Sequence, residues 1–191
     1  MSEASRQAVL KELEALSPSA RAWLASAVPS DGPGGNLLLD LPSAFARDAL
    51  SAHPMVEMQT AKGKIRVRLL PAEAPVHVYR FRHLVRTGFY NGLIFHEVET
   101  GRQVAGGDPR GDGWGDGGFL LRDELYPRSV VRGAVCSVQY GRDAGGCQFL
   151  IAAGHRPELD GVATVFGEVV EGMDVVDSLE PGDVIKEITE R

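Results

Sequence analysis

Residues 88–96 have the sequence Gly88-Phe89-Tyr90-Asn91-Gly92-Leu93-Ile94-Phe95-His96 and mark a change from helix to strand. Upstream, apolar residues recur at helical spacing from Pro75 onward, and Gly88 is suited to end this helix as its C-terminal cap. Downstream, the sequence predicts a short strand over 93–98. The junction therefore places one helix directly before one strand, and the flanking residues decide what surrounds them.

The segment before this helix predicts a β-hairpin. Val56, Met58 and Thr60 alternate with polar residues, Lys62-Gly63 suits a turn, and alternation resumes at Ile65. After residue 96, short strands are predicted at 134–139, 148–152, 162–170 and 183–189, with a second short helix at 171–179. Many short strands with two helices predict a mainly β fold, a closed antiparallel β-barrel capped by two helices.

Residues 1–53 differ from the rest of the chain in their pattern of apolar residues, which has helical spacing. Ser2 and Ser17-Pro18 are suited to begin two short helices, and a third is predicted near 43–50. His53-Pro54 marks the expected boundary. The sequence therefore predicts a helical N-terminal extension over 1–53 and a β-barrel domain over 55–191. The extension is interpreted either as a capping appendage or as the end of a helical repeat array.

Composition narrows the classes of function. The 191 residues carry a net charge of −6, and the Lys and Arg residues are scattered, which does not favour nucleic-acid binding. The longest apolar runs are far shorter than a membrane-spanning helix, and no signal peptide is evident. Cys136 and Cys147 are interpreted as two reduced thiols in a cytoplasmic protein.

Several further blocks follow residues 88–96 in a fixed order. They are Gly106-Gly107-Asp108-Pro109, Gly111-Asp112-Gly113, Gln148-Phe149-Leu150-Ile151, Leu159-Asp160-Gly161 and Val165-Phe166-Gly167-Glu168-Val169-Val170-Glu171-Gly172-Met173-Asp174-Val175-Val176. Together they resemble the cyclophilin-type peptidyl-prolyl cis-trans isomerases, most closely the compact bacterial members. The resemblance implies a barrel fold with Phe95, Phe149 and Phe166 in its core.

The chemistry of such an isomerase explains which side chains it needs. Rotation about a peptide bond meets a barrier of about 18–20 kcal/mol from amide resonance. Catalysis requires an apolar pocket for the proline ring and a positive donor near the prolyl nitrogen, but no nucleophile, metal or cofactor. The resemblance implies an arginine directly after the Phe-His pair as this donor. Here that position is Glu97, which has the wrong sign.

Other positions of the implied proline pocket are also replaced. The family's Phe-Met pair corresponds to Arg102-Gln103, and its glutamine before the Gly-Gly pair corresponds to Ala105. Where the family has a tryptophan before Leu-Asp-Gly, this chain has Glu158. Where the family has a histidine three residues after that aspartate, this chain has Ala163. These changes predict a more polar pocket and weaker burial of a proline ring. We hypothesise that Glu97 and Arg102 form an ion pair in which Arg102 partly replaces the missing guanidinium.

Some parts of the implied site are kept. Gln148 and Leu159 match the resemblance, Leu150 is a milder change, and the backbone of Val138-Gln139 is expected to pair with an extended peptide. The predicted substrate-binding residues are Arg102, Gln103, Val138, Gln139, Gln148, Leu150 and Leu159.

The glycine-rich segment 111–118 and its acids allow other interpretations. A phosphate-binding loop would need a strand before it and a helix after it, so a surface loop is favoured. Asp108, Asp112 and Asp116 do not have the spacing of a calcium-binding EF-hand loop, and no metal site is predicted. Cys147 is interpreted as a small buried residue rather than a regulatory thiol.

Three functions follow from these observations. The first is a peptidyl-prolyl isomerase that binds proline-containing segments, with weak or lost catalysis. The second is a module that binds such segments without isomerising them. The third is an interaction role in which residues 1–53 dock the barrel to a partner.

Overall fold

The computed structural model describes residues 54–191 except positions 116 and 140. Within this part, eight strands form one antiparallel sheet in the order β3-β4-β6-β5-β7-β2-β1-β8. The strands are β1 (Met55–Thr60), β2 (Lys64–Leu69), β3 (Phe95–Glu99), β4 (Gln103–Gly106), β5 (Ala134–Gln139), β6 (Gly145–Ala152), β7 (Val165–Glu171) and β8 (Ile185–Glu190).

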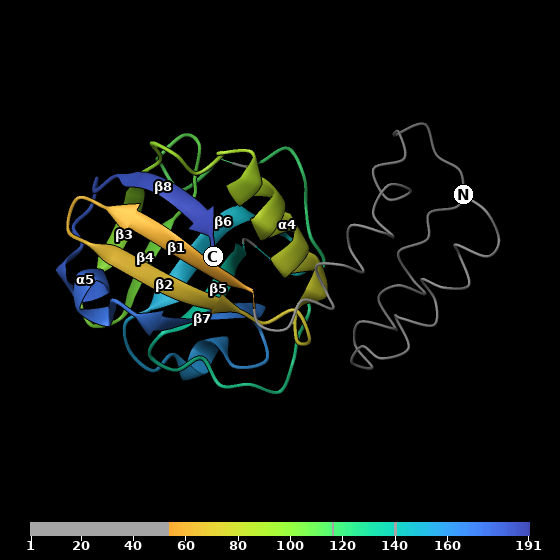
Figure 1. Ribbon diagram of the computed structural model, residues 1–191. Coiled ribbons are helices and arrows are strands. Elements are labelled where there is room, and N and C mark those ends of the chain that lie inside the picture. The colour runs from red at the N-terminus through yellow and green to blue at the C-terminus, as the bar shows by residue number, and fades with distance from the viewer. Residues whose placement is uncertain (1–53, 116, 140) are drawn as a thin grey trace.

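The sheet curls until its two edge strands meet. An isolated bridge joins Ile94 to Val184, and the Phe95 N–H donates to the Asp183 carbonyl at 2.9 Å. Helix α4 (Pro75–Arg86) covers one end of the curled sheet, and α5 (Met173–Ser178) lies at the other (Figure 1). The predicted architecture, a mainly β barrel-like sheet with two helices, is confirmed.

The core lies between the concave face of the sheet and α4. Phe81 on α4 packs 5.2 Å, between ring centroids, from both Tyr90 and Phe166. Phe149 meets Phe95 edge to face at 6.4 Å, and all five rings are at least nine-tenths buried. Aromatic pairs in such geometries add stability beyond the apolar area that they bury. The predicted core positions Phe95, Phe149 and Phe166 are therefore confirmed.

The first turn of α4 depends on a residue far along the chain. Ala74 precedes the helix and offers no side-chain cap. Instead the Glu124 carboxylate accepts hydrogen bonds from the backbone N–H groups of Val76, at 3.1 Å, and His77, at 2.9 Å. The His77 ring Nδ1 lies 2.7 Å from the same carboxylate. This buried acid thus satisfies amide groups that the helix itself leaves open.

The structure adds two features that sequence patterns did not predict. The short strand β4 lies between β3 and β6, and a 3₁₀ turn spans Pro157–Leu159. In addition, strand β6 begins at Gly145-Gly146, before the predicted start at residue 148, and Gly145 has no left-handed backbone angle. Glycine is needed there for space, because a Cβ atom on Gly145 would lie 2.9 Å from both His77 Nε2 and Ser137 Oγ.

Residues 1–53 lie outside the described residues. The predicted helical extension, the alternative of a repeat array and the docking role therefore stay predictions. Among the described residues, no helix has the length and apolar character needed to span a membrane.

Candidate functional site

A second apolar cluster lies on the outer face of the sheet. Alternate residues of β4, β5 and β6 point away from the core, so that Ala105, Cys136 and Leu150 are buried together. We call this the outer-face cluster; its buried members are Leu70, Ala105, Val130, Ala134, Cys136, Leu150, Ala152 and Val165, and Val138, Leu159 and Ala163 pack against them. The structure thus brings together the predicted site residues Val138, Leu150 and Leu159.

A chain of polar side chains adjoins this cluster on the β3–β4 side. Gln103 Nε2 donates to Glu97 Oε1, and Gln103 Oε1 accepts from Arg156 Nη1. Arg156 Nε donates to Glu158 Oε1 at 2.7 Å. Gln103, predicted as a pocket residue, therefore lies at the centre of a hydrogen-bonded chain. The acid at position 97 is held by an amide donor from the neighbouring strand.

The hypothesised Glu97–Arg102 ion pair is wrong. Arg102 Nη1 binds Glu99 at 2.7 Å and Arg102 Nη2 binds Glu158 at 3.3 Å, and the Arg102 side chain is 53% exposed. Glu99 lies only three residues away, across the turn between β3 and β4, and is therefore the local partner. Glu97 instead receives the Gln103 amide.

Arg156 is the residue of this site that sequence reasoning missed. Its side chain is 7% exposed, and its backbone N–H donates to the Val130 carbonyl at 2.8 Å. Hydrogen bonding to Arg156 lowers the pKa of Glu158 to about 2. Burial raises the pKa of the Cys136 thiol to about 12, and the charge of Arg156 opposes that rise.

Gln148, another predicted site residue, holds the glycine-rich loop. Its Nε2 donates to the Gly113 carbonyl at 3.0 Å and to the Gly115 carbonyl at 2.7 Å. On the other side of the loop, Asp108 accepts from the backbone N–H groups of Arg110 and Asp112 at 2.8 and 2.9 Å. Burial raises the pKa of Asp108, but these backbone donors outweigh it and the net shift is downward. The segment is thus a loop that two buried side chains fix.

Gln139, at the end of β5, turns its side chain toward the preceding loop. Its Nε2 donates to Asp123 Oδ1 at 2.5 Å. The Asp123 carboxylate also accepts from the backbone N–H of Asp143 at 3.1 Å. The Gln139 side chain is therefore engaged by Asp123 within the protein. The predicted contact of Gln139 with a peptide rests on its backbone alone.

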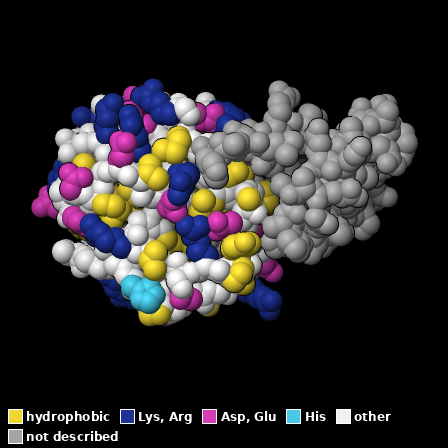
Figure 2. Space-filling view, turned by 60° about the horizontal axis from the view of Figure 1, so that its bottom comes forward, with side chains coloured by type: hydrophobic (Ala, Val, Ile, Leu, Met, Phe, Trp, Pro, Cys, Tyr) yellow, Lys and Arg dark blue, Asp and Glu magenta, His cyan; other side chains and the backbone are white. Residues whose placement is uncertain are grey.

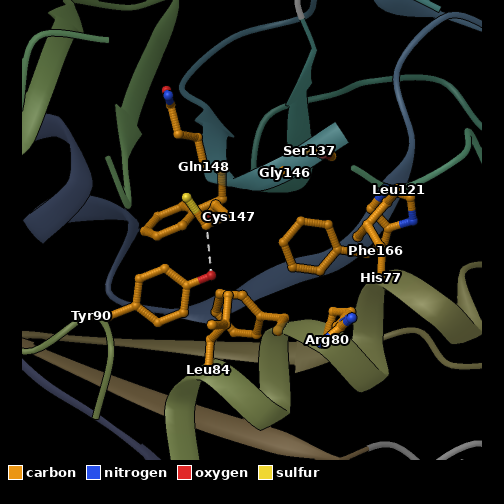
Figure 3. Close-up of a pocket in the computed structure, with 12 residues that line it drawn as sticks. His77, Arg80, Leu84, Tyr90, Leu121, Ser137, Gly146, Cys147, Gln148 and Phe166 are labelled. Carbon is orange, nitrogen blue, oxygen red and sulfur yellow. Dashed lines mark hydrogen bonds between the residues drawn. The ribbon is translucent and has the colours of Figure 1, made fainter. Parts of the chain in front are cut away.

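A small cavity lies behind the sheet, on the core side (Figure 3). Its volume is about 10 Å³, and it lies between α4 and strands β5 and β6. Tyr90 donates from its hydroxyl to the Cys147 carbonyl at 2.9 Å, while His77 Nε2 and Ser137 Oγ are buried and have no hydrogen-bond partner in the described structure. The space suits one water molecule and is too small for a proline ring.

The surface charges are mixed in sign. On the face that Figure 2 shows, Lys and Arg side chains lie among Asp and Glu side chains, with small apolar patches between them. No continuous basic stripe is visible on the described part of this face.

Comparisons with known proteins agree with this architecture. The family model described as cyclophilin type peptidyl-prolyl cis-trans isomerase/CLD matches residues 55–190. The chain is 40% identical to peptidyl-prolyl cis-trans isomerase B of Bacillus subtilis over 127 residues, which cover 65% of this chain and 89% of that protein. A Helicobacter pylori peptidyl-prolyl cis-trans isomerase is 39% identical over 135 residues, 69% of this chain and 83% of the relative.

Solved structures are similar as well. A cyclophilin type peptidyl-prolyl cis-trans isomerase of Cryptosporidium parvum superposes with a TM-score of 0.70 at 26% identity, covering 73% of this chain and 98% of that one. The same protein, solved in the presence of the dipeptide Ala-Pro, gives a TM-score of 0.68 at 26% identity, covering 72% and 98%. With a family model that spans the whole barrel domain, the chain belongs to the cyclophilin-type peptidyl-prolyl cis-trans isomerase family.

Proposed function

We propose that the surface over the outer-face cluster binds extended proline-containing segments and that isomerisation there is weak or lost. The observation that carries this proposal is the carboxylate of Glu97, which stands where the chemistry requires a positive donor and which accepts the Gln103 amide. An ionised carboxylate cannot donate a hydrogen bond to a twisted prolyl nitrogen. Removal of one well-placed donor typically lowers a rate by about 10²–10³.

The binding part of the proposal is supported by the apolar floor. Leu150 and Leu159 contribute apolar side chains to it. The Cryptosporidium relative was solved in the presence of the dipeptide Ala-Pro, and a proline-containing ligand of this kind suits an apolar surface. Beside it, Gln103 stands where the resemblance implies an apolar side chain, and Arg156 hydrogen-bonds to it. Affinity for a proline ring is therefore expected to be lower, at about 25 cal/mol for each Å² of apolar surface that the ligand leaves unburied.

The alternative is a module that binds without turning over its ligand. It is favoured by the number of replaced pocket positions, which include Ala105 as well as Glu97. A cytoplasmic setting belongs to the same proposal, since neither Cys136 nor Cys147 takes part in a disulfide among the described residues.

Two measurements test the proposal. A protease-coupled assay on a short X-Pro peptide gives the rate of isomerisation, with the Bacillus subtilis relative assayed in parallel as a reference. A chemical-shift titration with the same peptide gives the dissociation constant. We expect measurable binding with a rate far below the reference. A rate within tenfold of the reference would show that the proposal of impaired catalysis is wrong. Absence of binding would overturn the whole proposal.

A further inference from the structure

We propose that Arg156 is the ligand-contacting guanidinium beside the outer-face cluster, donating from Nη2 to a carbonyl oxygen of the bound segment. The inference rests on the proposed function and deepens it, because it assigns to a residue outside the resemblance a hydrogen-bond donor for the backbone of the bound segment.

The first support is the unused donor. Arg156 Nε binds Glu158 at 2.7 Å, and Nη1 binds the Gln103 side-chain oxygen. Nη2 makes no hydrogen bond to any of the residues that the structure describes. A guanidinium that is 7% exposed and has a free N–H pair is costly unless water or a ligand satisfies it.

The second support is orientation. Two partners on separate elements, Gln103 on β4 and Glu158 on the 3₁₀ turn, hold the planar guanidinium from two edges. A donor that is fixed before the ligand arrives loses little conformational entropy on binding. Arg102 lacks this arrangement, because its side chain is 53% exposed and contacts two surface carboxylates.

The third support is position. Gln103 connects the Arg156 guanidinium to Glu97, so the two side chains lie one amide apart. The Arg156 backbone N–H also donates at 2.8 Å to the carbonyl of Val130, a buried member of the outer-face cluster. If a peptide segment lies over the outer-face cluster, its carbonyl oxygens therefore lie beside the Arg156 guanidinium.

The local charges select a neutral acceptor. Glu158 compensates the charge of Arg156, and the Glu97 carboxylate lies on the far side of Gln103. A ligand carboxylate would be repelled by Glu97 and would find Arg156 already paired. A peptide carbonyl oxygen, which carries only partial charge, meets no such repulsion.

The test compares two arginines that bind the same carboxylate. Arg156→Ala and Arg102→Met each remove a guanidinium from Glu158, but only Arg156 contacts the bound segment in this proposal. Peptide binding is measured by chemical-shift titration of the labelled full chain with an Ala-Pro-containing tetrapeptide, and thermal unfolding is recorded for each variant. We expect Arg156→Ala to weaken binding about tenfold or more, and Arg102→Met to leave the dissociation constant within about twofold.

A further readout separates ligand contact from a structural role. Methylguanidinium, added at a concentration that does not alter thermal unfolding, is expected to restore part of the affinity of Arg156→Ala and none for wild type. If Arg156→Ala does not fold, Arg156→Lys serves in its place, because the three N–H bonds of an ammonium diverge from one nitrogen and cannot reproduce the planar guanidinium that reaches two partners and a ligand from separate nitrogens; the same weakening is expected. Equal affinities of wild type, Arg102→Met and the Arg156 variant would overturn this inference alone, whereas no binding by wild type would overturn the proposed function with it.

Discussion

Glu97 and Arg156 are joined by a single side chain: Gln103 donates from Nε2 to the Glu97 carboxylate and accepts at Oε1 from the Arg156 guanidinium. The acid at the position of the family arginine is therefore fixed rather than free to move. Any change at one end of this chain is expected to alter the other.

Glu97→Arg is expected to raise the isomerisation rate. The new guanidinium would supply the donor that the reaction needs, and we expect a gain of about tenfold. This is less than the roughly 10²–10³ that a well-placed donor gives, because Gln103 and the neighbouring Arg156 keep the site polar. The protease-coupled assay on a short X-Pro peptide measures the change, with Glu97→Gln as the matched control. An unchanged rate would mean that loss of the apolar pocket limits catalysis instead.

Glu57 makes stability depend on pH. This buried carboxylate on β1 binds Lys64 at 2.8 Å and Arg191 at 2.9 Å, and hydrogen bonds from Arg191 and then Lys64 lower its pKa from 4.5 to about 2. Because the folded-state pKa is depressed, the ionised form contributes stability above about pH 4.5, and this contribution is lost as the pH falls through about 2. We expect Glu57→Gln to be less stable than wild type at pH 7, with the difference shrinking toward pH 2.

Urea unfolding at several pH values measures this difference. Glu180→Gln is the control, since Glu180 is 77% exposed in its pair with Lys62 and such pairs contribute little. A gap between wild type and Glu57→Gln that stays constant from pH 7 to pH 3 would contradict the prediction.

Gly145→Ala is expected to destabilise the fold by about 1–3 kcal/mol. The added methyl group would lie 2.9 Å from His77 Nε2 and from Ser137 Oγ, both inside the core. Gly146→Ala is a matched control on the same strand, because its nearest neighbour would be the Phe119 carbonyl oxygen at 4.0 Å. Chemical denaturation measures both, and equal effects would show that space at Gly145 is not what requires glycine.

Cys136 is expected to resist thiol reagents in the folded protein. Burial raises its pKa to about 12, so the reactive thiolate is scarce near neutral pH. Cys147 is also buried. The absorbance produced by Ellman's reagent at pH 8 should rise slowly for the native protein. After unfolding in urea it should rise quickly to the value expected for two thiols per chain. Rapid labelling of the native state would contradict this.

Local patterns were sufficient for much of the fold. The hairpin of β1 and β2 follows from alternation of apolar residues, and the start of α4 at Pro75 follows from proline and helical spacing. Strand β4 could not be predicted in this way. Gln103–Gly106 is short and ends in glycine, and it is a strand because β3 and β6 supply backbone partners on both of its sides.

The site was predictable only where it follows family blocks. Leu150 and Leu159 were placed by the resemblance, and the structure brings them to one cluster. Arg156 could not be found from its neighbours, because it acquires its role by contact with Gln103, 53 residues earlier in the chain. Arg102 is a different case, because its partner Glu99 lies only three residues away and the choice between Glu97 and Glu99 depends on the geometry of the turn between β3 and β4.

The capping of α4 by Glu124 has a consequence for synthesis on the ribosome. The amides of Val76 and His77 emerge 48 and 47 residues before the carboxylate that binds them. A nascent chain that ends before Glu124 must leave these amides to water, so its first helical turn frays. We infer that this turn becomes stable only when the later loop that carries Glu124 packs against it. The first turn of α4 and that loop would then form in the same cooperative folding step. Slow hydrogen exchange at these two amides would then report global unfolding rather than local opening.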